Sequence, residues 1–283
     1  MRLWISLCLM ALVCPQVGMA ETSKDLVELL PTGYINWTKG VLEAKGCYPL
    51  ENPSVRDAGS QQLNPLAHQL ACENALNTLK QVRMDATRNV AHTLSINAAI
   101  GAKVKQMADT APVVQEVSLP NGTYEVTVRV NLLGGFAQLM LPEEIKQVEP
   151  VKAMPSANRS GVKPAIPAGE VVHTGLIVDA RGIGAKPAMV PLLVDENGKQ
   201  VYGSAFVSRE YAVQFGMCEY VQWSDGVYAH VRVAPNPLKV KGLRTLSERK
   251  CDIVISNADA ANLRDASAHL GFLKECRVII VLD

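Results

Sequence analysis

Hydrophobic positions in the first half of the chain follow two spacings, and each spacing predicts a type of element. Apolar residues recur every three or four positions over 72–82 and over 96–107, which is typical of helices that bury one face. Over 123–130 apolar and polar residues alternate strictly, which predicts a strand. Asn121-Gly122 predicts a tight turn that joins it to a strand over 113–119. The pattern predicts a small α+β domain with helices on one face of an antiparallel sheet.

Three further segments complete this first domain. Residues Tyr34–Trp37 and Val41–Ala44 flank Lys39-Gly40 and predict a short hairpin. Pro65 stands where a helix would place its first residue. The segment 82–90 fits either a strand or a continuation of the preceding helix.

The second half predicts another α+β domain, built around a mainly antiparallel sheet. Strands are expected over 171–179, 188–194 and 200–202, and the last two are joined by a turn at Asp195–Gly198.

A strand–helix–strand unit closes the chain. Residues 252–255 form an apolar strand, and Ser256 with Asp259 has the spacing of a helix cap. Residues 277–282 are almost all aliphatic, as in a strand that is covered on both faces. The unit predicts a parallel strand pair with a right-handed crossover. The helix between them is expected to bury one apolar face, formed by Leu263, Ala266, Leu270 and Leu273.

Four prolines interrupt the segment between the two predicted domains, at positions 150, 155, 164 and 167. Proline breaks helices and sheet ladders, so residues 148–169 are expected to form an extended linker. The predicted organisation is a leader over 1–20, a first domain over 21–147, the linker, and a second domain over 170–283. With such a linker the two domains need not keep one relative orientation.

Residues 1–20 have the form of a secretory signal peptide, with Arg2 before the apolar run Leu3–Val13 and small residues at Gly18-Met19-Ala20. Cleavage after Ala20 predicts a periplasmic protein. Lipid attachment at Cys14 is the alternative and would give an outer-membrane lipoprotein, but the branched Val13 and the following proline disfavour it.

Charge is balanced once the leader is removed. The chain has 28 Lys and Arg against 27 Asp and Glu, and loss of Arg2 leaves 27 of each. A neutral chain without charge runs has no field that would attract nucleic acid or anionic lipid, so we expect neither as a partner.

The five cysteines after the leader are an odd number in an oxidising compartment. Two disulfides are expected, Cys47 with Cys72 and Cys218 with Cys251, and the alternative that most of the five are buried thiols stays open.

The turn after the first strand of the second domain is the candidate ligand site. Gly182 and Gly184 follow a strand, as in loops that cradle phosphate, but a third glycine is missing and Pro187 interrupts the helix such a loop would need. A turn with positive backbone dihedrals explains both glycines, with Asp179 and Arg181 pairing or capping it.

No catalytic, metal-binding or cofactor-binding residue is predicted. The five histidines are scattered, and the one Ser-x-x-Lys pattern, at Ser247–Lys250, lacks its companion motifs. Trp37 and Trp223 are the candidate interface residues, with partial burial under a loop as the alternative for each.

Three segments of the first half resemble a family of small bacterial envelope lipoproteins that includes the flagellar basal-disc lipoprotein FlgP and, more distantly, the first domain of the flagellar assembly protein FlgT. They are Gly33–Gly46, the Ala-rich stretch Ala67–Leu79, and Leu119–Val128. The resemblance covers about Gly33 to Leu141. Residues 174–182 and 271–278 are similar to a companion domain of uncharacterised exported proteins.

The resemblance implies a non-enzymatic, lipoprotein-like envelope component that works by assembly or docking near the outer membrane or a flagellar motor. Its expected partners are other envelope proteins or further copies of itself, and it brings no cofactor. The alternative is a periplasmic small-ligand binder or enzyme with its site at Asp179–Gly184.

Overall fold

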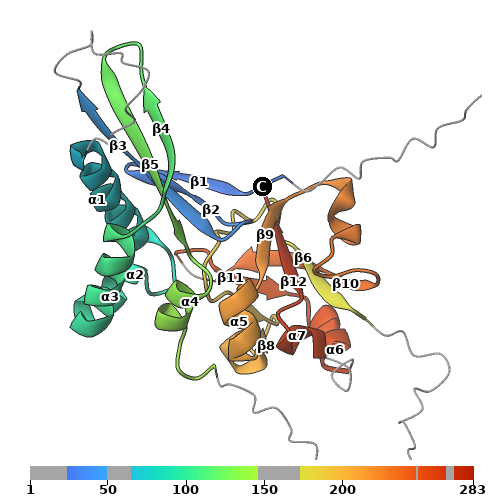
Figure 1. The fold of residues 1–283 in the computed structure, drawn as a ribbon. Helices are drawn as coiled ribbons and strands as arrows, with labels where there is room; N and C mark the ends of the chain where they lie inside the picture. The colour runs from blue at the N-terminus through green and yellow to red at the C-terminus, as the bar shows by residue number, and fades with distance from the viewer. Residues whose placement is uncertain (1–23, 50–64, 146–172, 247, 266–270) are drawn as a thin grey trace, which may run out of the picture.

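The computed structural model describes residues 24–49, 65–145, 173–246, 248–265 and 271–283, which form two β-sheets with helices packed against them (Figure 1). The α+β class is confirmed. The predicted leader and the predicted linker lie outside the described residues. No helix in the described part of the chain is long and apolar enough to cross a membrane.

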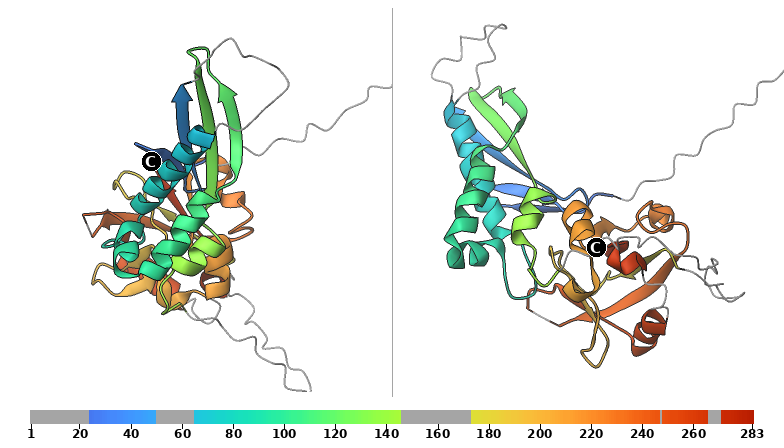
Figure 2. Two further views of the ribbon diagram at one scale, coloured as in Figure 1. Left: turned by 60° about the vertical axis from the view of Figure 1, so that its left-hand side comes forward. Right: turned by 60° about the horizontal axis from the view of Figure 1, so that its bottom comes forward.

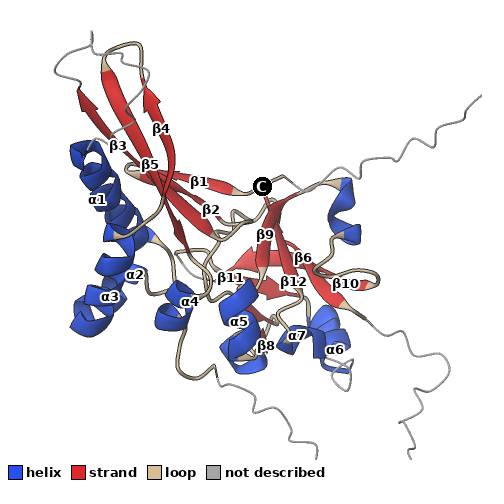
Figure 3. Cartoon of the chain, viewed as in Figure 1, coloured by secondary structure: helices blue, strands red, loops and turns tan. Residues whose placement is uncertain are grey.

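The first sheet is antiparallel and has five strands in the order β1-β2-β3-β5-β4. Its helices cover one face only (Figure 3). The strands are β1 (Val27–Leu30), β2 (Gly33–Asn36), β3 (Val41–Pro49), β4 (Val113–Ser118) and β5 (Thr123–Asn131), and the helices are α1 (Pro65–Gln81), α2 (Val90–Ile96) and α3 (Ala98–Asp109).

Small residues let α1 lie directly on β3. Leu42, Ala44 and Gly46 face the helix, as the alternating burial of β3 shows. A Cβ atom at Gly46 would come within 2.0 Å of the Ala67 carbonyl oxygen, so only glycine fits beneath the helix. This close packing explains why the Ala-rich stretch predicted as a helix is buried against the sheet.

Most predicted elements of the first domain are confirmed, including the hairpin of β4 and β5 with Gly122 at a φ of +79°. Residues 82–89 form neither of the two expected structures. They make a turn closed by a bridge between Arg83 and Asn89, and Asn89 then caps α2. Strand β1 was not predicted at all.

The second sheet has seven strands in the order β8-β7-β11-β10-β6-β12-β9. These are β6 (Gly175–Asp179), β7 (Leu192–Val194), β8 (Gln200–Tyr202), β9 (Glu219–Gln222), β10 (Pro237–Thr245), β11 (Asp252–Ile255) and β12 (Val278–Leu282). The helices of this half are α5 (Arg209–Phe215), α6 (Asn257–Asp265) and α7 (Gly271–Lys274), with 3₁₀ turns η1 (Ser204–Phe206) and η2 (Asp225–Ala229).

This sheet is mixed, whereas the antiparallel character expected for both sheets holds for the first. Strands β6, β9, β10 and β12 run parallel to one another, and β10 pairs antiparallel with β11. Strands β9 and β10 and helix α5 were missed by sequence reasoning. In β10, buried Val240 and Gly242 alternate with exposed Lys239, Lys241 and Leu243, which is the pattern of a half-buried strand.

The closing unit has the expected elements but not the expected pairing. Ser256 caps α6 through the Asp259 backbone N–H at 3.0 Å, as predicted. Strands β11 and β12, however, are separated by β10 and β6 and run in opposite directions. Both sides of β11 are occupied by other strands, because β7 pairs with it in parallel and β10 pairs with it in the antiparallel direction. Leu263 and Leu273 are buried as expected, and Ala266 and Leu270 lie outside the described residues.

Buried side chains of both sheets belong to one hydrophobic core, which holds the two halves in one relative orientation although the linker alone does not require it. The ribbon views show the two halves lying against each other (Figure 2). Trp37 packs edge-on against Tyr220 with ring centroids 6.0 Å apart. Asp25 forms a backbone bridge to Val221 of β9. The proline content of a connecting segment carries no information about a buried interface elsewhere in the chain.

Arg209 strengthens this interface by capping a helix of the other half. Its guanidinium donates to the carbonyl oxygens of Gln138 at 2.8 Å and Pro142 at 2.9 Å, at the end of α4 (Gly135–Met140). The last carbonyls of a helix have no partner within the helix, so a cation there satisfies them and also complements the helix dipole.

Candidate functional site

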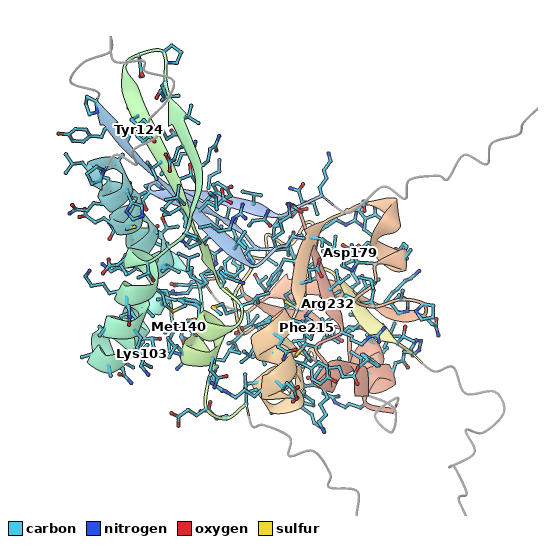
Figure 4. All side chains as sticks on the ribbon, viewed as in Figure 1. Lys103, Tyr124, Met140, Asp179, Phe215 and Arg232 are labelled. Atoms are coloured by element: carbon cyan, nitrogen blue, oxygen red, sulfur yellow. The ribbon has the colours of Figure 1, made fainter. Side chains whose placement is uncertain are left out.

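The carboxyl ends of three parallel strands bring the candidate turn together with residues distant in sequence. Strands β6, β12 and β9 end at Asp179, Leu282 and Gln222, side by side at one edge of the sheet. Figure 4 marks Asp179 at this edge. In open sheets with parallel strands, ligands bind outside the carboxyl ends of the strands.

Arg181 is held on three sides. Its guanidinium forms two parallel hydrogen bonds to Asp179, at 2.8 and 2.9 Å, and stacks on the Trp223 ring at 4.0 Å from the centroid. The Asp179 carboxylate also accepts from the Arg181 backbone N–H at 3.2 Å. The predicted pairing and capping of this turn by Asp179 and Arg181 is confirmed. Lys241 of β10 adds a second cation 3.5 Å from Asp179.

Gly182 and Gly184 adopt φ values of +78° and +64°, the left-handed region that side chains disfavour. The predicted reason for both glycines is therefore confirmed. The Gly182 N–H donates to both carboxylate oxygens of Asp283, at 3.0 and 3.1 Å. Lys250 also approaches the turn, with Nζ 3.5 Å from the position that a Cβ at Gly184 would take.

The pH dependence of stability should report the Asp179–Arg181 pair. Hydrogen bonding to Arg181 lowers the pKa of Asp179 from 3.8 to about 2. Because the pKa is depressed in the folded state, this contribution is complete above the unfolded-state value and is lost as the pH falls from about 4 to about 2.

Asp179→Asn should therefore be less stable than the parent by about 1 kcal/mol near neutral pH, a value reduced for solvent screening of a partly exposed pair. Thermal unfolding at several pH values measures the difference. It should shrink below about pH 4; a difference that stays constant to about pH 2.5 would show that the ion pair does not cause it.

Trp37 and Trp223 have different environments. Trp37 is 7% exposed and lies between the sheets, with its Nε1 donating to Glu28 at 2.8 Å. It is an internal contact and not a partner surface. Trp223 is half-buried, packs against Tyr228 with centroids 5.5 Å apart, and carries Arg181 on its face.

The expected disulfides are absent, since all five described cysteines carry free thiols. Cys47 lies on the face of β3 that points away from α1, while Cys72 is a buried residue of α1, which packs on the other face. Cys218 immediately precedes β9 and Cys251 immediately precedes β11, and three strands lie between β9 and β11. Neither pair can meet without unfolding a sheet.

The first sheet presents a second candidate surface, on the face opposite its helices. Two cross-strand ion pairs lie on this face, Lys45 with Glu125 and Arg129 with Glu43. Towards β1 the surface becomes apolar, with Leu29 80% exposed and Val27 43% exposed.

Strands β1 and β4 are the two edges of this sheet, and each pairs with one neighbour only. Among the described residues, β1 makes backbone hydrogen bonds as a strand to β2 alone. A bulge between Val113 and Gln115 protects β4 in the manner usual for sheet edges, whereas β1 is regular and apolar. The signal missed in the sequence is the run of four apolar residues among Leu26–Leu30, before Pro31.

A small cavity lies between the two halves, lined mainly by apolar residues that include Trp37, Leu133, Met189 and Tyr220. Its volume is about 40 Å³, room for a few water molecules and far below the several hundred Å³ of small-molecule sites. In the described ranges, no three His, Cys, Asp or Glu side chains are grouped to hold a metal ion.

Comparison with known proteins gives a family match for the second half of the chain. The model of the second domain of Treponema pallidum Tp0624 matches residues 175–283, from β6 to Asp283. The match includes the whole seven-stranded sheet and the candidate turn, but less than half of the chain. No curated protein matches the chain.

Proposed function

We propose that this protein is a non-enzymatic component of the bacterial cell envelope that works by assembly, and that copies of it associate through strand β1. The observation that carries the proposal is the unprotected apolar edge at Val27 and Leu29. A regular edge strand offers a row of free backbone donors and acceptors, which is a template for pairing with another strand.

A second copy of the same strand fits this edge. In an antiparallel pair with Glu28 on the twofold axis, Val27 of one copy lies opposite Leu29 of the other, so the apolar side chains meet on one face. Glu28 points to the other face, where its carboxylate is paired with Arg83. That pairing limits repulsion between the two Glu28 side chains, and the two five-stranded sheets would join into one.

The cellular setting follows from the sequence. The signal peptide supports export to the periplasm, and the resemblance of residues 33–141 to the FlgP-containing lipoprotein family supports a place at the outer membrane or a flagellar motor. The charge-balanced surface and the ion-paired sheet face are suited to contact with other envelope proteins and not with nucleic acid.

Leu29→Lys should weaken self-association at least tenfold, because a charge on an edge strand opposes pairing and an apolar contact is lost from each copy. Sedimentation equilibrium of the mature chain, from about 1 to 500 µM, measures the dimer fraction. Because β1 has only four residues, we expect association in the micromolar range or weaker.

Ile96→Lys is the matched control, since Ile96 is 70% exposed at the end of α2 and does not belong to the sheet. It should dimerise like the parent. A parent chain that stays monomeric throughout the range, or equal weakening by both substitutions, would contradict the proposal.

A further inference from the structure

We propose that the turn Arg181–Gly184 is a carboxylate-binding site that the side chain of Asp283 occupies as an internal ligand. An external carboxylate would bind by replacing Asp283. This site is separate from the β1 edge, and its test is independent of self-association.

The backbone of the turn is arranged to receive an anion. Gly182 and Gly184 have positive φ values on either side of Ile183, and left-handed residues of this kind occur in the concave backbone loops that bind anions. The Gly182 N–H already holds a carboxylate, with both Asp283 oxygens within 3.1 Å. No heavy atom lies within 4 Å of the Cβ position at Gly182, so the space beside the turn is open.

Three cations lie around the turn. Arg181 and Lys241 contact Asp179, and Lys250 lies over Gly184. Asp179 is engaged by Arg181 and Lys241, whereas Lys250 forms no ion pair with any described carboxylate although its Nζ lies over Gly184. Once Asp283 leaves, the Gly182 N–H loses its acceptor, and the Lys250 ammonium over Gly184 of the same turn is the nearby cation without a described carboxylate partner.

Trp223 keeps this arrangement in place. Its ring supports the Arg181 guanidinium at 4.0 Å, and the two bonds to Asp179 fix the guanidinium plane. Arg181, the first residue of the turn, therefore keeps its position whether or not Asp283 is bound to the turn. A site that is already formed loses little binding energy to ordering.

An internal ligand competes with external ones at an effective concentration in the millimolar range or above. The intact chain should therefore bind a free carboxylate weakly. Removing the competitor should strengthen the apparent affinity, since the binding-competent fraction rises.

The test is a titration of the ¹⁵N-labelled mature chain with succinate, followed through the Gly182 amide signal and compared with sodium chloride at equal ionic strength. In Asp283→Ala, succinate should shift this signal with an apparent affinity at least tenfold higher than in the parent. Adding Lys250→Ala to that variant should reduce the affinity by about tenfold.

Lys103→Ala in the same background is the control, because Lys103 is exposed on α3 at the opposite side of the molecule from Asp179 (Figure 4). It should leave binding unchanged. Three results would overturn the proposal: no succinate-specific shift in Asp283→Ala, an equal loss with Lys103→Ala, or tighter binding of inorganic phosphate than of succinate. A thermal unfolding curve for each variant confirms that the fold is retained.

Discussion

Ending the chain at Arg277, which removes strand β12, should abolish cooperative folding of the whole chain and not of its second half alone. Strand β12 lies between β6 and β9, and all five of its side chains are at most 3% exposed. Burial of five aliphatic side chains is worth about 10 kcal/mol, which is comparable to the total stability of a domain.

The first half should unfold with it because the two sheets share one core. Without β12, strand β9 loses its only neighbour within the sheet, and β9 carries the Tyr220 and Val221 contacts to the first half. Circular dichroism during heating, together with limited proteolysis, measures what remains folded. Removal of Asp283 alone is the control and should leave a cooperative transition. If residues 24–145 of the truncated chain still unfolded cooperatively, the two sheets would not form a single folding unit.

Trp37→Ala should destabilise the protein by about 3 to 5 kcal/mol, the range for truncation of a large buried aromatic side chain. The ring is almost fully buried, and it makes an edge-on contact with Tyr220 and a cation–π contact with Arg83 at 5.7 Å. It also donates to Glu28, which would lose one partner. Chemical denaturation, with the slope checked for two-state behaviour, measures the loss.

Trp223→Ala is the comparison variant, because Trp223 lies near the surface whereas Trp37 lies at the contact between the two sheets. Trp223 is half-buried and its removal should cost about 1 to 2 kcal/mol, from lost apolar burial and the Arg181 stack. If the two substitutions lowered the free energy of unfolding by equal amounts, the contact of Trp37 between the two sheets would not have the importance that the structure indicates.

Sequence patterns were enough to predict those elements that are determined by residues close together in the sequence. The alternation over 123–130 gave β5, Asn121-Gly122 gave its turn, and the cap at Ser256 gave the start of α6. The order of strands in the second sheet has no such local signal. The strand order depends on which strand edges are already paired with other strands. Strand β10, which separates β11 from β6, was itself not recognised in the sequence.

The candidate turn shows the same limit. Asp179, Arg181 and the two glycines are close in sequence, so their pairing and backbone could be predicted. Trp223, Lys250 and Asp283 reach the turn only through the strand order and through the loop after β10. The cysteine pairs failed for a related reason, because proximity within a predicted domain does not say which face of a sheet a residue occupies.

Hydrogen exchange of β1 amides as a function of protein concentration tests the central claim, association through β1, most directly. If copies pair through β1, the outward-facing amides among Val27–Leu30 gain hydrogen-bond partners, and their protection should rise with concentration in the parent but not in Leu29→Lys. Exchange at β1 that is the same at all concentrations, in a sample that sedimentation shows to be dimeric, would place the contact elsewhere and contradict the account.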